Sequence, residues 1–186
     1  DNYEDNSGSV EIVITKADPT CNIDGYIGVY DGNPHGATGS CIGVKEELLS
    51  TLNLGDSFTY VPGGTANWTF TDSTGNYNDD AGSVKIMILM ATLTITADNQ
   101  TAQYSDATPP LTFNYSGFVG SHDPDDLTSK PSCSTNREIS SPVGDYSITC
   151  SGGEDDNYSF NYEDGNFTVT KENAAVTFDN NNPAAL

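Results

Sequence analysis

The sequence predicts an all-β protein built from tandem Ig-like β-sandwich domains, each with one disulfide. Three observations predict this fold class: apolar and polar residues alternate along short segments, turn-forming residues separate these segments, and parts of the sequence repeat. Alternation with a period of two is typical of a half-buried antiparallel strand. Short strands separated by frequent turns indicate β-sandwiches.

The alternating segments justify the expected strands one by one. Val10, Ile12 and Ile14 share one face of a strand, and four later segments alternate in the same way: 93–96, 146–150, 158–162 and 167–170. Glycine- and proline-rich turns lie at 31–34, 61–64, 141–144 and 151–153. Helical periodicity is nearly absent, which leaves strands as the main element.

Two sequence motifs recur and divide the chain. Residues 2–14 are repeated at 76–88 and more loosely from 157 onward, and an aromatic-Asp motif followed by proline occurs at 30–35, 104–111 and 178–186. Each unit therefore opens with the second motif and closes with the first. We expect the last strand of a preceding repeat at 1–15, full units at 16–89 and 90–170, and the first strand of a following repeat at 171–186.

The charge of the chain excludes several classes of partner. There are 27 acidic residues against 6 basic ones, and the formal net charge is −21. Nucleic acids and anionic membrane surfaces both require basic patches, so neither is an expected partner. The longest apolar run, at 86–91, is far shorter than a membrane helix, and no membrane insertion is expected.

The four cysteines fall two in each full unit. Of the three pairings that four cysteines allow, only Cys21–Cys41 with Cys133–Cys150 leaves each repeat self-contained. Each bridge closes a loop of roughly 20 residues, which stabilises a small domain by about 3 kcal/mol in the chain-entropy model. The alternative is zinc bound by four thiolates, but no Cys-x-x-Cys pair favours it. Disulfides indicate an oxidising compartment, and we expect a secreted protein at the extracellular cell surface.

The order of motifs in the second unit resembles the MBG ("mostly beta") repeat of bacterial surface proteins. The resemblance covers about 90–170 and rests on these segments: 93–98, 104–111, 116–118, 141–149, 157–158 and 164–169. Residues 16–89 are similar to a related bacterial Ig-like repeat through 29–37, 61–70 and 76–79. Such repeats occur in long adhesin-like or matrix proteins, so the resemblance implies a structural stalk or fibre without catalysis. Cysteines are not a usual part of these repeats.

Three acidic clusters are candidate calcium sites, because Ca²⁺ takes six to eight oxygen ligands. Their residues are Asp79, Asp80, Asp123, Asp125, Asp126, Glu154, Asp155 and Asp156. None follows the Asp-x-Asp-x-Asp-Gly pattern of a calcium loop, and a solvated acidic loop is the alternative interpretation. No cofactor is required by this prediction, with calcium the one candidate.

Asn-x-Ser/Thr sequences mark five candidate glycosylation sites, which need a suitable transferase to be used. They are Asn67, Asn99, Asn114, Asn157 and Asn166. Motifs for common hydrolase nucleophiles, metalloproteases and phosphate loops are missing from the sequence, and we expect no enzyme activity.

The predicted function is that of a structural repeat segment in an extracellular surface rod or filament, such as an adhesin stalk, a matrix protein or an appendage. The expected partners are copies of itself or adjacent repeats, joined through assembly strands that contain Val10, Ile12, Ile14, Val176 and Phe178. We expect such an assembly to have a repeating two-domain period. The alternative function is a module that binds surface glycans or cells through loops at a sandwich end. Its candidate contact residues in the first unit are Tyr26, Tyr30 and Trp68.

Overall fold

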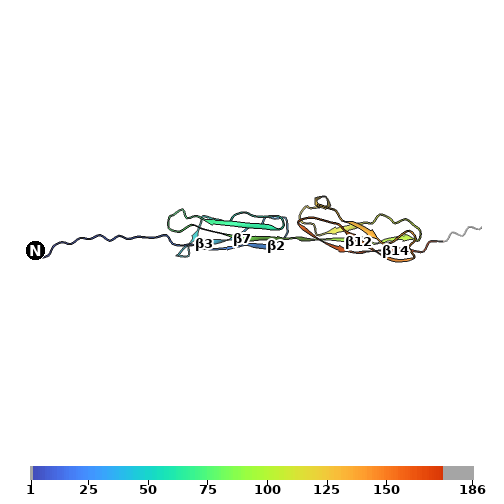
Figure 1. The fold of residues 1–186 in the computed structure, drawn as a ribbon, viewed down its shortest axis with the longest axis horizontal. Coiled ribbons are helices and arrows are strands. Elements are labelled where there is room, and N and C mark those ends of the chain that lie inside the picture. The colour runs from blue at the N-terminus through green and yellow to red at the C-terminus, as the bar shows by residue number, and fades with distance from the viewer. Residues whose placement is uncertain (1, 174–186) are drawn as a thin grey trace, which may run out of the picture. The chain divides into compact units, whose positions relative to one another are not determined.

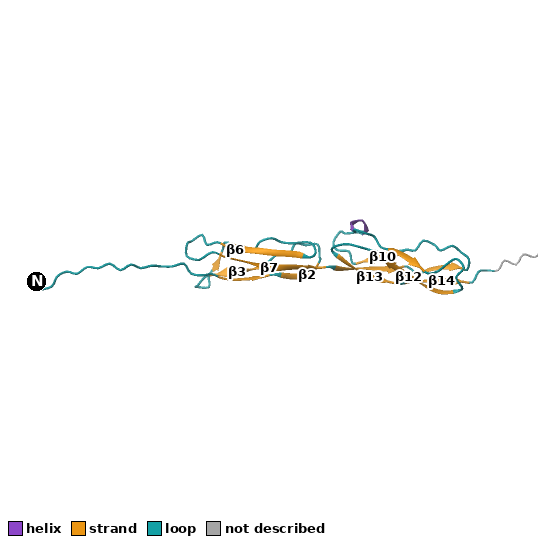
Figure 2. Ribbon diagram, in the orientation of Figure 1, coloured by secondary structure: helices purple, strands orange, loops and turns teal. Residues whose placement is uncertain are grey.

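A computed structural model of the chain describes residues 2–173. The chain divides at one peptide bond into two compact units, which we call unit 1 (Asp1–Leu89) and unit 2 (Met90–Leu186). Strands dominate both units, and the one helix in the described residues is the short 3-10 helix η1 (Pro124–Asp126) (Figures 1 and 2). The all-β fold predicted from the alternating pattern is therefore confirmed.

Unit 1 contains one antiparallel sheet and one mixed sheet. One has the order β1-β3-β4 and the other the order β2-β7-β6-β5. The strands are β1 (Thr20–Asp24), β2 (Tyr26–Val29), β3 (Thr38–Ile42), β4 (Leu48–Leu49), β5 (Leu52–Asn53), β6 (Gly63–Phe70) and β7 (Asp80–Leu89). The long strand β7 pairs antiparallel with β6 and parallel with β2.

The core of unit 1 lies between its two sheets. Ala66 and Ile86, from the sheet of β6 and β7, pack with Ala37 and with Ile23 of β1. A second cluster brings Cys41 of β3 against Phe70 and Tyr77. These buried positions alternate with exposed ones along β6 and β7, as a sheet with one buried face requires.

Unit 2 also contains two sheets, of orders β10-β8-β13 and β11-β12-β14-β9. The strands are β8 (Ala91–Ala97), β9 (Gln100–Gln103), β10 (Phe113–Ser116), β11 (Ser132–Thr135), β12 (Gly144–Ser151), β13 (Tyr158–Glu163) and β14 (Gly165–Thr170). Its buried side chains come from both sheets, and include Leu93 and Ile95 of β8, Ile148 of β12 and Phe167 of β14. Each unit is thus a two-layered sandwich.

The closing segment of each unit runs parallel to the opening one, but the two units divide it differently. In unit 2, β13 pairs along its whole length with β8, and the chain then changes sheets at Asp164 to form β14. In unit 1, only Tyr77 makes the equivalent bridge, to Ala17, and the chain enters the other sheet at Asp80. This early change of sheet makes β7 a single strand paired with β6 over eight residues.

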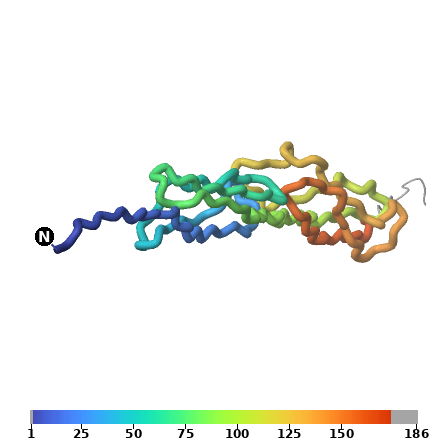
Figure 3. Tube along the Cα trace, turned by 60° about the vertical axis from the view of Figure 1, so that its left-hand side comes forward, coloured from blue at the N-terminus to red at the C-terminus, as the bar shows by residue number. Residues whose placement is uncertain are grey.

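The predicted N-terminal strand has no strand partner within the described residues. Residues 2–15 have no strand and appear as a single unpaired trace, dark blue in Figure 3. The physical reason is that a strand needs a partner edge, and the edges next to β6 in unit 1 are taken by β7 and β5. Val176 and Phe178, the other predicted assembly residues, lie outside the described residues.

Candidate functional site

The N-terminal segment carries an apolar face that no part of the described chain covers. Val10, Ile12 and Ile14 are 87%, 83% and 91% exposed. Their counterparts in the repeat are Val84, Ile86 and Ile88, of which the two isoleucines are buried in the core of unit 1. A run of large apolar side chains in water is unfavourable, and such a segment marks a site for pairing with another strand.

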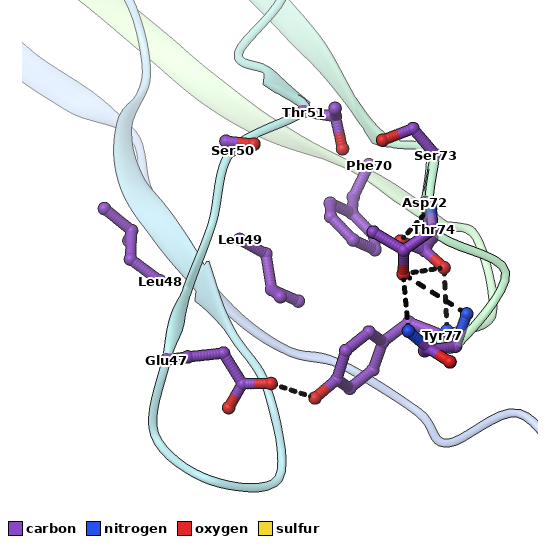
Figure 4. Close-up of a pocket in the computed structure, with 11 residues that line it drawn as sticks. Glu47, Leu48, Leu49, Ser50, Thr51, Phe70, Asp72, Ser73, Thr74 and Tyr77 are labelled. Atoms are coloured by element: carbon purple, nitrogen blue, oxygen red, sulfur yellow. Dashed lines mark hydrogen bonds between the residues drawn. The ribbon is translucent and has the colours of Figure 1, made fainter.

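A cavity of about 230 Å³ lies in unit 1 where the closing segment begins. Phe70 and Leu49 supply its apolar lining, and polar residues surround them (Figure 4). The remaining lining residues come from the β4–β5 region and from the turn before Tyr77: Glu47, Leu48, Ser50, Thr51, Asp72, Ser73, Thr74, Asn76 and Tyr77.

The two carboxylates of this cavity are held by hydrogen bonds from their own unit. The backbone N–H of Tyr77 donates to Asp72 at 2.9 Å, and the backbone and hydroxyl of Thr74 donate to the same carboxylate. These bonds, chiefly the one from Tyr77, lower the pKa of Asp72 to about 2. Both Asp72 and its turn are therefore fixed at neutral pH.

Glu47 is tied to the same tyrosine from the opposite side (Figure 4). The Tyr77 hydroxyl donates to the Glu47 carboxylate and accepts from the backbone N–H of Val44. The bond from Tyr77 lowers the pKa of Glu47 and raises the pKa of Tyr77. The cavity therefore combines an apolar floor with ionised carboxylates and hydroxyl groups, a lining suited to a small polar or cationic group.

The aromatic residues proposed for glycan contact do not form an exposed platform. Tyr30 is buried, and the half-buried ring of Tyr26 stacks on His35 at 3.9 Å between centroids. Trp68 is half-buried and packs across β6 and β7 onto Gly82. These three side chains stabilise the sandwich, because each presents its ring to a neighbour within unit 1 rather than to solvent.

The opening motif of each unit is held by a different basic side chain. In unit 1, His35 hydrogen-bonds to Asp31 at 2.9 Å. In unit 2, Arg137 donates to the Thr108 hydroxyl at 2.8 Å and to the Asp106 carbonyl at 2.6 Å. Arg137 belongs to none of the motifs that recur in the sequence.

Arg137 is buried, although arginine is rarely buried in proteins. Its guanidinium lies 5.3 Å from the ring centroid of Phe167, and its Nε has no hydrogen-bond partner among the described residues. The one arginine in a chain with so few bases was the sequence signal that could have drawn attention to it.

The four cysteines form the two pairs expected from their distribution. Cys21–Cys41 joins directly opposite residues of β1 and β3, and Cys133–Cys150 joins directly opposite residues of β11 and β12. The Cα atoms are 4.0 Å apart in both pairs. Each disulfide thus links neighbouring strands within one sheet of its own unit.

The candidate calcium residues use their carboxylates to fix local turns. Asp123 accepts from the Asp125 backbone and Asp126 accepts from the Asp123 backbone, and together they form the capping box of η1. Asp125 forms an ion pair with Lys130. Within residues 2–173, no three His, Cys, Asp or Glu side chains are grouped so that they could hold a metal ion. Calcium binding stays an untested prediction.

The other candidate calcium residues are similarly engaged or stand apart. Asp79 accepts from the Asp72 backbone at 3.0 Å, and Asp80 accepts from the next backbone N–H. Asp155 accepts from the Asn157 backbone, whereas Glu154 forms a backbone bridge with Ser129. Asp156 is exposed beside them.

The five candidate glycosylation sites differ in exposure. Asn67, Asn99, Asn114 and Asn166 are exposed, and Asn157 is half-buried. Two of the exposed amides donate hydrogen bonds within unit 2: Asn114 to Asp98 at 2.6 Å, and Asn166 to Asp145 at 3.1 Å. Glycosylation at either position would replace one N–H of the donating amide, and the Asn99 side chain accepts from the Asn166 backbone N–H at 2.8 Å.

Comparison with known proteins finds a family that part of the second unit resembles. Residues 93–168 match the model of the MBG domain, YGX type. No curated protein matches the chain, and no solved structure does. The similarity of 16–89 to a bacterial Ig-like repeat therefore stays a prediction.

The MBG assignment agrees with the chemistry of the chain. MBG domains are typical of extracellular surface proteins, and the two disulfides fit an oxidising environment. Among the described residues there is no helix with the length and apolar character needed to cross a bilayer. Residues 93–168 of unit 2 are thus similar to the MBG domain of the YGX type, and this similarity suggests a surface-associated repeat module.

Proposed function

We propose that this chain is a structural repeat segment of an extracellular surface rod or filament, assembled from tandem or strand-complemented β-sandwiches. The observation that carries the proposal is that residues 2–14 repeat the sequence of β7 while their apolar face is fully exposed. A β-strand of this kind becomes stable when another sheet supplies its hydrogen-bond partners.

The two units are suited to serve as links in such an assembly. Each has its own core and its own disulfide, so we expect each to fold independently of the other. Met90 is the one residue between β7 and β8, which leaves little free chain at the junction. These features support a mechanical role as a link, and such a role needs no catalytic group.

Burial of the N-terminal segment would supply the link between successive members. In a covalent array an adjacent repeat receives residues 2–14, and in an assembly of separate chains a neighbouring copy receives them by strand addition. The surface of such an assembly is strongly acidic. This negative charge favours solubility and disfavours binding to nucleic acids.

Immunogold electron microscopy of intact, unpermeabilised source cells tests this function. Antibodies raised against residues 16–170 are expected to label extended structures outside the cell envelope. An antibody absorbed with the purified chain provides the control. Labelling confined to the cell interior, or to isolated points without extended structures, would contradict the proposal.

A second candidate function is binding of surface glycans or cells through the cavity next to Tyr77. The specific observation in its favour is the cavity of about 230 Å³, which places hydroxyl groups and carboxylates around an apolar floor. Such a lining is used for small polar ligands. Glycan-array screening of the full chain tests this function, with Asp72→Asn as the matched variant. Saccharide binding that the variant loses would support it, and an array without signal would contradict it.

A further inference from the structure

We infer that the unit which receives residues 2–14 is of the same type as unit 1 and is not an MBG unit. The inference rests on the proposed function, because it assumes that this segment is a closing strand. It adds the identity of the partner: a sandwich whose β6-like strand carries a large aromatic side chain facing Gly8, as Trp68 faces Gly82.

The first support is the degree of sequence identity. Eight of the thirteen residues at 2–14 are identical to those at 76–88, when Tyr3 is aligned with Tyr77. Three of the thirteen are identical to 157–169, when Tyr3 is aligned with Tyr158. The segment is thus a closing strand of the first type.

The second support is a glycine whose partner is visible in unit 1. Trp68 and Gly82 are directly opposite each other on β6 and β7, and a Cβ atom at Gly82 would lie 2.7 Å from the indole ring. Gly82 therefore leaves the space that the ring occupies. Gly8 stands at the same place in the repeat, yet nothing lies within 4 Å of it. A strand that carries glycine here is suited to a partner with a large ring.

In unit 2, the position that the ungapped alignment pairs with Gly8 lies before the change of sheet and has a different environment. It is Glu163, which pairs with Thr96 of β8 rather than with β12, and whose carboxylate accepts from the Thr96 hydroxyl at 2.7 Å. The half-buried positions before it are Phe160 and Tyr162, whose rings are 6.3 Å apart. In residues 2–14 the aligned positions hold Asp5 and Ser7, which cannot replace that aromatic contact.

The start of β14 also disfavours residues 2–14 as a closing segment of unit 2. Gly165 begins β14, and a Cβ atom there would lie 3.0 Å from the Ala97 carbonyl oxygen. The aligned residue of the N-terminal segment is Val10. In this ungapped alignment a valine in place of Gly165 requires Ala97 to shift by a few tenths of an ångström, whereas unit 1 accepts Val84 at the equivalent place.

The order of units follows from this partner. A strictly alternating assembly would place an MBG-type closing strand before unit 1. The observed segment instead indicates that a unit of the first type stands there, followed by unit 1 and then by the MBG unit. In a covalent array this order has at least two units of the first type in succession, which differs from the two-domain period expected from the sequence.

Reciprocal grafts in the full chain test the inference. In the first graft, residues 76–88 receive the sequence of 2–14 through five substitutions: Asn78→Glu, Asp80→Asn, Ala81→Ser, Lys85→Glu and Met87→Val. In the second graft, residues 157–169 receive the same sequence. Fluorescence of Trp68, the one tryptophan, reports on unit 1, and amide hydrogen exchange of β8 reports on unit 2.

We expect the first graft to keep the Trp68 emission and the thermal transition of unit 1. The second graft should abolish the transition of unit 2 and the protection of β8, while unit 1 is unchanged. The first graft with Val at position 82 is the control, and it should shift the Trp68 emission toward that of the unfolded chain. Loss of unit 1 in the first graft, or an intact unit 2 in the second, would overturn the inference. Both results are independent of whether the protein forms surface filaments.

Discussion

Unit 1 and unit 2 are both two-layered sandwiches, but their disulfides lie in different sheets. The disulfide of unit 1 links β1 to β3, in the sheet that lacks the closing strand, whereas that of unit 2 links β11 to β12, in the sheet that contains it. In unit 2, β13 covers one edge of β8, but in unit 1 the equivalent edge of β1 has only the bridge at Ala17. The covalent link thus lies in the three-stranded sheet of unit 1 and in the four-stranded sheet of unit 2.

The clamps on the opening motifs differ in the same way. His35 and Asp31 hold the turn of unit 1 at the surface, and Arg137 holds that of unit 2 from a buried position. The comparison teaches that the two units secure the same sequence motif with different side chains. Each of the following predictions tests one of these differences.

Removal of the disulfides should have the largest effect. The Cys133→Ala/Cys150→Ala double variant is expected to lower the stability of unit 2 by about 3 kcal/mol, a decrease in Tm of about 12–24 °C for a domain of this size. Cys21→Ala/Cys41→Ala should lower the stability of unit 1 by more than this amount, because Cys41 is also buried against Phe70 and Tyr77. Scanning calorimetry measures both transitions, and a shift of both units in each variant would contradict their independence.

Arg137 provides the next largest effect. Arg137→Ala removes two hydrogen bonds and the contact with Phe167, and should destabilise unit 2 by about 2–3 kcal/mol. Hydrogen exchange at 104–108 should accelerate, since the opening motif loses its clamp. His35→Ala is the matched control and should loosen 31–35 instead. Unchanged exchange at 104–108 in Arg137→Ala would show that the clamp is not needed.

The two repeated glycines should respond in opposite ways. Gly82→Val forces the Trp68 ring to move and should cost unit 1 about 1–3 kcal/mol, with a change in tryptophan emission. Gly8→Val should leave the isolated chain unchanged, because nothing lies near that residue. Equal effects of the two variants would mean that Gly8 already packs within this chain.

Acid should weaken unit 1 through two carboxylates. Hydrogen bonds from the Asn33 backbone and then from His35 lower the pKa of Asp31 to about 2, and the pKa of Asp72 is also about 2. A lowered pKa stabilises the folded state above the ordinary value of 3.8, and this stabilisation is lost as the pH falls toward 2.

The calorimetric Tm of unit 1, measured from pH 6 to pH 2, should therefore decrease below about pH 4. Asp31→Asn/Asp72→Asn should flatten this dependence. Asp145→Asn is the control in unit 2, where hydrogen bonds from Asn166 and Thr168 lower the pKa of Asp145. An unchanged slope in the double variant would contradict the assignment to these two groups.

Much of the fold was predictable because it depends on local patterns. The alternation at 146–150 and 167–170 predicts β12 and β14, and the distribution of cysteines predicts both disulfides. The change of sheet at Asp80 in unit 1 and at Asp164 in unit 2 was not predictable, since it depends on which distant strand offers a free edge.

The candidate sites show the same division. The exposed apolar segment was predictable from its own sequence, through Val10, Ile12 and Ile14. The bond between Glu47 and Tyr77 joins residues 30 positions apart, and Arg137 reaches Asp106 across 31 positions. A single sequence gives no local signal for such contacts, so the partners of these residues are known from the structure alone.

Hydrogen exchange of residues 6–14 tests the central claim most directly. In the isolated 186-residue chain these amides should exchange as fast as an unstructured peptide, because the segment has no strand partner there. In protein harvested intact from the cell surface, the account predicts that they are protected to the same degree as 80–88 in β7. Fast exchange of 6–14 in the harvested material would contradict the claim that this segment is a closing strand buried by another unit.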